Sequence, residues 1–106
     1  MALRRKSIRN PLPVRLRQLR EMRGLSQKEL GVLAGIDPSA ASPRINQYER
    51  GKHAPNFSVA ARLAEVLGAP TAFLYAEEDA LANQILSFRE EPITGRRRVP
   101  VVARGS

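Results

Sequence analysis

The sequence contains no cysteine, only one histidine and no long run of apolar residues. Without cysteine the chain can form neither a disulfide framework nor a thiolate site, and a reducing cytoplasm is its natural setting. A single histidine cannot build a zinc site or a nucleophile-base pair of the usual kind. No apolar stretch approaches the roughly 20 residues of a membrane span, and none follows the charged start as a signal peptide requires. We therefore expect a cytoplasmic, non-enzymatic protein with no metal, cofactor or membrane anchor.

Charge is abundant and unevenly distributed. The chain of 106 residues, enough for one domain, holds 18 basic and 10 acidic residues. Eight basic residues and one acidic residue fall in the first 24 positions, and four basic residues and no acidic one fall in the last 14. Basic tails around a near-neutral middle suit a polyanion such as nucleic acid, or an anionic membrane surface. The alternative is that they only keep the protein soluble.

The first helix is expected over residues 13–23, because proline favours the first helical turn and Gly24 can supply a left-handed cap. Apolar residues recur along it at helical spacing, and this pattern predicts one buried face. The residues on that face are Leu12, Leu16, Leu19 and Met22.

A second helix is expected to begin at a capping box, in which the Ser26 hydroxyl accepts a backbone N–H and the Glu29 side chain reaches back. It should run to about Ala34. Gly31 inside it costs roughly 1 kcal/mol relative to alanine, which makes sense if another helix crosses closely there. Its expected buried residues are Leu30 and Leu33.

The start of the third helix depends on a proline. A helix capped by Asp37 would place Pro43 past the first turn, where proline removes a hydrogen bond and kinks the chain. Ser42 as the cap, with Pro43 at the first helical position, avoids this cost. We therefore expect a short helical turn at 38–41 and then a third helix over 43–50.

Two more helices are expected before residue 76. The fourth begins after Asn56 as its cap and ends at Gly68, and a short fifth helix opens at Pro70. Their apolar residues at helical spacing are expected in the core: Val59, Leu63, Val66, Leu67, Phe73 and Leu74.

A sixth helix is expected over residues 77–89, because three acidic residues at its start match the positive end of a helix dipole. Leu81, Ile85 and Phe88 form an apolar stripe on it. The stripe either completes the core or forms the surface that binds a second copy or another protein.

The expected third helix carries two faces of different chemistry. At 100° per residue, Ile45 and Tyr48 fall on one face, whereas Asn46, Gln47 and Arg50 fall on the opposite one. Amide side chains can bond bidentately to an adenine edge in the major groove, and arginine can hold phosphate or guanine. This pattern predicts double-stranded DNA as the partner.

The order and spacing of several short motifs resemble the phage repressor and Cro type of helix-turn-helix domain, over roughly residues 13–75. The resemblance implies a domain of five helices whose third helix enters the major groove, in dimers that read palindromic operators. The motifs that carry it are Leu-Ser-Gln-Lys-Glu-Leu at 25–30, Gly35-Ile36, Ile45, Tyr48-Glu49-Arg50-Gly51 and Leu63-Ala64-x-x-Leu67-Gly68.

The resemblance also implies roles for single residues. Gln27 matches the glutamine that touches phosphate and braces the third helix, and Asn46 and Gln47 match positions that face base edges. Arg20 and Glu49 match positions that often hold a buried ion pair. Other residues expected on the DNA-binding surface are Ser26, Ser42, Arg44, Arg50 and Lys52, with Arg44 toward the flank of the apolar face, and Arg4, Arg5 and Lys6 in the basic arm.

One departure from the family pattern lies before the third helix. Gly35 and Gly51 are sixteen residues apart, about one helical turn more than the family usually has, so about one turn is inserted at 37–42. A weaker likeness relates residues 98–102 to the strand that opens the self-cleaving domain of longer phage-type repressors. Either the chain is a truncated form of such a repressor or the likeness is accidental, and we favour an accidental likeness.

We therefore expect an all-α fold: a five-helix repressor-like domain over 13–75, a C-terminal helix in 76–91, and flexible basic segments over 1–12 and 92–106. The leading function is a sequence-specific regulator of bacterial or phage type, a repressor that binds DNA as a homodimer. One alternative is an antitoxin that binds a toxin and its own operator. Another is an RNA- or ribosome-associated adaptor, although five aromatic residues offer no stacking platform for single strands.

Overall fold

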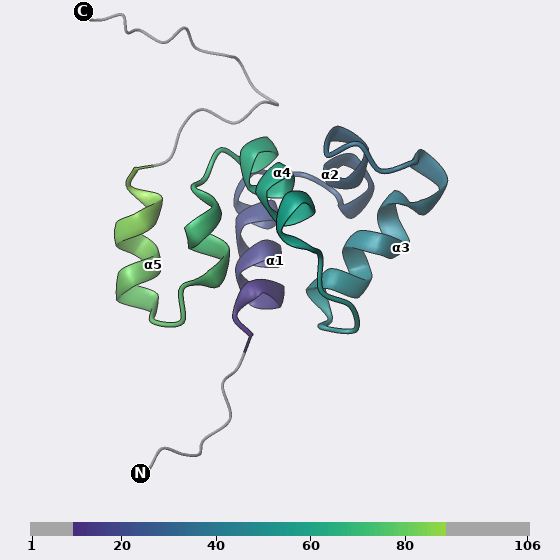
Figure 1. Cartoon of the computed structure of the whole chain (residues 1–106). Coiled ribbons are helices and arrows are strands. Elements are labelled where there is room, and N and C mark those ends of the chain that lie inside the picture. The colour runs from purple at the N-terminus through teal and green to yellow at the C-terminus, as the bar shows by residue number, and fades with distance from the viewer. Residues whose placement is uncertain (1–9, 89–106) are drawn as a thin grey trace, which may run out of the picture.

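The computed structural model describes residues 10–88, and this part of the chain is all helical, with no strand. In chain order the helices are α1 (Leu12–Met22), α2 (Gln27–Leu33), α3 (Pro38–Glu49), α4 (Phe57–Leu67), the 3-10 helix η1 (Thr71–Tyr75) and α5 (Asp79–Leu86). In Figure 1, α1 is central, α2 and α3 lie on one side of it, and α5 lies on the other. Helix η1 packs against α1, α4 and α5. The expected six helices are present, the fifth as a 3-10 helix.

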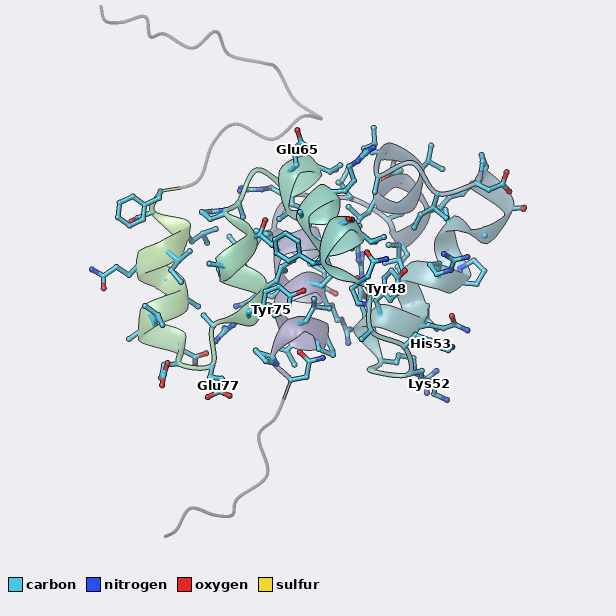
Figure 2. The ribbon with its side chains drawn as sticks, in the orientation of Figure 1. Tyr48, Lys52, His53, Glu65, Tyr75 and Glu77 are labelled. Atoms are coloured by element: carbon cyan, nitrogen blue, oxygen red, sulfur yellow. The ribbon has the colours of Figure 1, made fainter. Side chains whose placement is uncertain are left out.

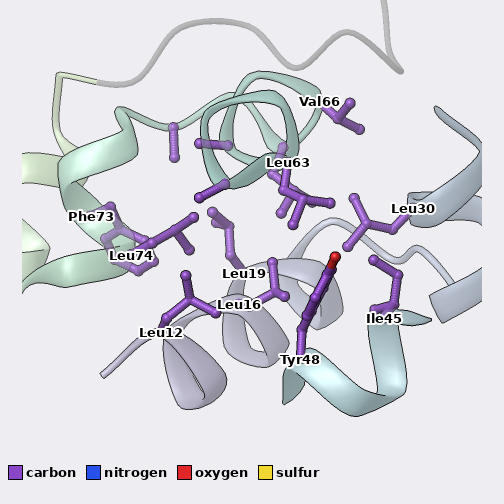
Figure 3. Packing of buried hydrophobic residues seen from close by; sticks show 14 of the residues in the cluster. Leu12, Leu16, Leu19, Leu30, Ile45, Tyr48, Leu63, Val66, Phe73 and Leu74 are labelled. Carbon is purple, nitrogen blue, oxygen red and sulfur yellow. The ribbon is translucent and has the colours of Figure 1, made fainter. Parts of the chain in front are cut away.

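One core joins α1, α2, α3, α4 and η1 (Figure 3), and Ala82 of α5 also belongs to it. The exposed fractions of Leu16 and Leu19 on α1, Ile45 on α3 and Leu63 on α4 are all 0%. Two residues expected in the core are exposed instead, Met22 by 57% and Leu33 by 43%. Both stand at the C-terminal end of a helix, Met22 as the last residue of α1 and Leu33 as the last residue of α2.

Helix α3 begins earlier than expected, so the predicted short turn at 38–41 followed by a helix over 43–50 is wrong. The helix is continuous from Pro38, and the Asp37 side chain caps it by accepting the Ser39 N–H at 3.1 Å. Ser42 lies inside the helix and caps nothing. Pro43 removes the hydrogen bond that would have ended on the carbonyl of Ser39, an exposed residue in the first turn of the helix.

A continuous buried stripe explains why the longer helix forms. Ala41, Ile45 and Tyr48 are spaced at i, i+4 and i+7, and their exposed fractions are 0%, 0% and 6%. This stripe runs through the segment where a break was expected, so burial on both sides of Pro43 outweighs one missing hydrogen bond. The inserted turn therefore lengthens α3 at its N-terminus.

Helix α5 is shorter than the expected 77–89, and it buries a different face. Ala82 is fully buried and Ile85 packs against the core, whereas Leu81 is 47% and Phe88 72% exposed. The stripe of Leu81, Ile85 and Phe88 therefore does not complete the core as a unit. Ala82 is instead the residue of α5 that is buried in the core.

A buried arginine holds α5 to the rest of the fold. Arg15 on α1 is 6% exposed, and its guanidinium donates to the carbonyls of Ala76 at 3.0 Å and Glu77 at 3.3 Å. It also pairs with Asp79 at 3.0 Å and lies 5.8 Å from the centre of the Phe73 ring. Sequence reasoning missed this role, although Arg15 stands three residues after Leu12 on the buried face.

Candidate nucleic-acid interface

The approach of α2 to α3 depends on one glycine. A Cβ atom on Gly31 would lie 2.6 Å from the Cβ and 2.9 Å from the Cα of Ala41. Both distances are too short for nonbonded carbon atoms. The close crossing that the sequence predicted at Gly31 is therefore confirmed.

The turn between these helices is fixed by backbone hydrogen bonds. Gly35 has φ of +94°, a conformation that favours glycine. The Ile36 N–H donates to the Gly31 carbonyl at 2.9 Å and closes a Schellman motif at the end of α2. Asp37 then starts α3, and hydrogen bonds from the hydroxyl and N–H of Ser39 lower the pKa of its carboxyl group.

Helix α3 turns its polar side away from the core. Arg44 and Arg50 are exposed, and Asn46 and Gln47 are partly buried. Arg44, Asn46 and Gln47 lie on α3, and Arg50 is the C-cap residue directly after it. Together they carry two amides and two positive charges on a helix whose opposite face, with Ile45 and its neighbours on the buried stripe, packs into the core. The arrangement can offer donors and acceptors to base edges and cations to phosphates.

A network of four side chains connects this surface to the core. Arg20 on α1 donates from Nε to Glu49 Oε2 at 2.6 Å and from Nη2 to Oε1 at 3.0 Å. The Glu49 side chain is only 4% exposed, and its hydrogen bond raises the pKa of Arg20. Gln27 Nε2 donates to Glu49 Oε1 at 3.1 Å and to Asn46 Oδ1 at 3.3 Å. The expected ion pair is present, and Gln27 does bridge α2 to α3.

The remaining candidates lie around this network. The Ser26 hydroxyl accepts the Glu29 N–H at 2.9 Å, while the Ser26 N–H donates to Glu29 Oε1 at 2.8 Å, so the capping box is confirmed. Lys52 is exposed in the loop after α3 (Figure 2). Its N–H donates to the Gln47 carbonyl at 2.9 Å, which folds this loop back onto the helix end.

Three of the proposed DNA-binding residues, Arg4, Arg5 and Lys6, lie outside the described residues. The helical turn that the sequence predicted at 38–41 is the first turn of α3, and Ser39 is exposed on it. Asp37 followed by proline, a cap and a favoured first helical residue, is the local signal for a helix that begins there. Within residues 10–88, no group of three His, Cys, Asp or Glu side chains could hold a metal ion. No helix in the described part of the chain has the length and apolar character needed to cross a membrane.

Comparisons with known proteins agree with this geometry. A family model described as Helix-turn-helix matches residues 16–74, which include α2, α3 and the turn between them. Among solved structures, the chain is similar to the crystal structure of the transcriptional regulator BswR, at 50% sequence identity and a TM-score of 0.69. The match covers 72% of this chain and 75% of that one. No curated protein matches.

Proposed function

This chain belongs to the Cro/C1-type helix-turn-helix family of DNA-binding domains, and we propose that it represses transcription by binding a palindromic operator as a homodimer. The observation that carries the proposal is the outward face of α3, where Asn46 and Gln47 accompany Arg44 and Arg50 on a rigidly anchored helix. Transcriptional regulation is also the role named for BswR, to which the chain is 50% identical.

The roles divide by chemistry. Gln47 and Asn46 contact base edges in the major groove, and the Gln47 amide can match a base with paired hydrogen bonds. The exposed cations Arg44, Arg50 and Lys52 hold phosphates on either side of the groove. The hydroxyls of Ser26 and Ser42 belong to the same surface, with Ser26 at the start of α2.

The apolar side chains left on α5 are the proposed dimer surface. Phe88 and Leu81 are 72% and 47% exposed, and Ile85 beside them is partly buried. A second copy related by a two-fold axis would cover the same residues on both chains. It would also set two copies of α3 into successive major grooves, about 34 Å apart.

Selection from random duplexes, followed by footprinting, tests this function. We expect a palindromic site whose half-sites are separated by one helical turn. The Leu81→Glu/Phe88→Glu variant should stay folded, become monomeric in light scattering and lose the preference for two half-sites. Phe57→Glu is the matched control, because Phe57 is 68% exposed on α4.

Three results would contradict the proposal. One is selection that enriches no DNA sequence, which would favour the RNA-associated adaptor. Another is enrichment of a single half-site by a protein that stays monomeric. The third is a dimer that survives the two glutamates on α5 but is disrupted in Phe57→Glu, which would locate the interface on α4.

A further inference from the structure

The direction of the Gln27 amide is dictated by the buried ion pair. Both carboxylate oxygens of Glu49 accept hydrogen bonds from Arg20, and Glu49 Oε1 also accepts one from Gln27 Nε2. An ionised carboxylate can only accept. Gln27 must therefore present its NH2 group, and not its carbonyl oxygen, to Glu49.

The same nitrogen sets the direction of the Asn46 amide. Gln27 Nε2 lies 3.3 Å from Asn46 Oδ1 as well as 3.1 Å from Glu49 Oε1. Because Nε2 carries only donors, the atom of Asn46 that faces it must be the acceptor. The Oδ1 atom of Asn46 therefore accepts a hydrogen bond from Gln27 on α2, whereas its Nδ2 atom makes no hydrogen bond with Gln27.

We infer that Gln27 is a specificity-determining positioning residue, which makes Asn46 a hydrogen-bond donor toward DNA. This inference rests on the proposed function and adds to it which bases Asn46 can contact. In the major groove, guanine, adenine and thymine all present an acceptor, whereas cytosine presents only its N4 donor. Asn46 therefore excludes cytosine at the base that it contacts.

Competition binding to duplexes that carry each of the four bases at every operator position tests this. The operator position that Asn46 contacts is identified as the one where Asn46→Ala abolishes the base preference. At that position the wild type should bind the cytosine duplex about 3- to 10-fold more weakly than the others, the range for one hydrogen bond. Gln27→Met, which leaves the Arg20–Glu49 pair intact, should abolish this difference and leave the Gln47 position unchanged.

Two further variants separate positioning from other roles of Gln27. Gln27→Lys also carries only donors, so it should retain the exclusion of cytosine, although its added charge strengthens binding to every duplex. Asn46→Asp presents only acceptors and should turn the preference toward cytosine. Urea unfolding of each variant checks that the domain remains folded.

The inference fails if Gln27→Met weakens all duplexes equally and keeps the base preference, because Gln27 then only contacts phosphate. It also fails if Asn46→Ala changes the preference at no position while Gln47→Ala does, a result that leaves the proposed function standing. If the wild type itself has no sequence preference, the proposed function fails.

Discussion

Arg20 and Glu49, 29 residues apart in the sequence, form a two-pronged ion pair between α1 and α3 with N–O distances of 2.6 and 3.0 Å. Their side chains are 13% and 4% exposed. A third guanidinium nitrogen, Nη1, donates to the Leu25 carbonyl at 2.9 Å, so Arg20 also fixes the segment before α2. The pair therefore holds three elements of the domain in register.

Removing one partner should be costly. Glu49→Ala leaves the Arg20 guanidinium partly buried and unpaired, and we expect the free energy of unfolding to fall by about 3 kcal/mol or more. Glu21→Ala is the matched control, because Glu21 is 55% exposed and 4.0 Å from Arg20, and it should cost about 1 kcal/mol or less. Urea denaturation of both variants measures the difference. Equal destabilisation of the two variants would show that the buried Arg20–Glu49 pair contributes no more to the free energy of unfolding than an exposed pair does.

The contact between α2 and α3 gives a second prediction. In Gly31→Ala, the new methyl group would meet Ala41 at 2.6 Å, so the helices must separate. Over-packing should outweigh the gain of about 1 kcal/mol in helix propensity and lower stability by about 2 kcal/mol. Adding Ala41→Gly should recover only part of this stability, since the Ala41 Cα would still lie 2.9 Å away. A Gly31→Ala protein as stable as the wild type in thermal unfolding would refute the close crossing.

The attachment of α5 should depend on Arg15 more than on its acidic partner. Arg15→Met removes the donors to the carbonyls of Ala76 and Glu77, and we expect a destabilisation of about 2 kcal/mol. Asp79 is 89% exposed, so Asp79→Asn should cost less than about 1 kcal/mol. Hydrogen exchange should show faster opening of residues 79–86 in Arg15→Met alone. Equal protection in the two variants would mean that other interactions hold the helix.

Much of the fold could be predicted because its signals are local. The capping box at Ser26 and Glu29 and the caps at Asn56 and Gly68 each depend on residues within a few positions of one another. The Arg20–Glu49 pair could be predicted only through the family resemblance. It joins residues far apart in sequence, and no local pattern reveals it.

The predictions from sequence were wrong where packing between helices determines the structure. Pro43 predicted a helix break because the rule against internal proline is local, whereas the stripe of Ala41, Ile45 and Tyr48 is buried by other helices. The apolar pattern of α5 likewise could not tell that Ala82, and not Leu81, faces the core. The link from Gln27 to Asn46 depends on how α2 crosses α3, and helical spacing carries no information on that crossing.

The basic arm, outside the described residues, should add affinity without specificity. Deleting residues 1–9, which include four basic residues, should weaken binding to operator and random DNA alike. The slope of log affinity against log salt should become shallower by about 0.9 for each phosphate that the protein no longer neutralises. Glutamine in place of the four basic residues, at unchanged length, is the control and should have the same effect. An unchanged slope would mean that the arm only solubilises the protein.

The central claim is that α3 reads base edges, and the comparison of Gln47→Ala with Arg50→Ala in the selected operator tests it most directly. Gln47→Ala removes a partly buried amide that can bond bidentately to a base, and such a contact is worth roughly 1–3 kcal/mol of base discrimination. The variant should therefore lose its base preference at one symmetric pair of operator positions and keep its affinity for random DNA. Arg50→Ala should weaken binding to every sequence about equally, as removal of a phosphate-binding cation does. A Gln47→Ala protein that retains the full preference at every position would contradict the account.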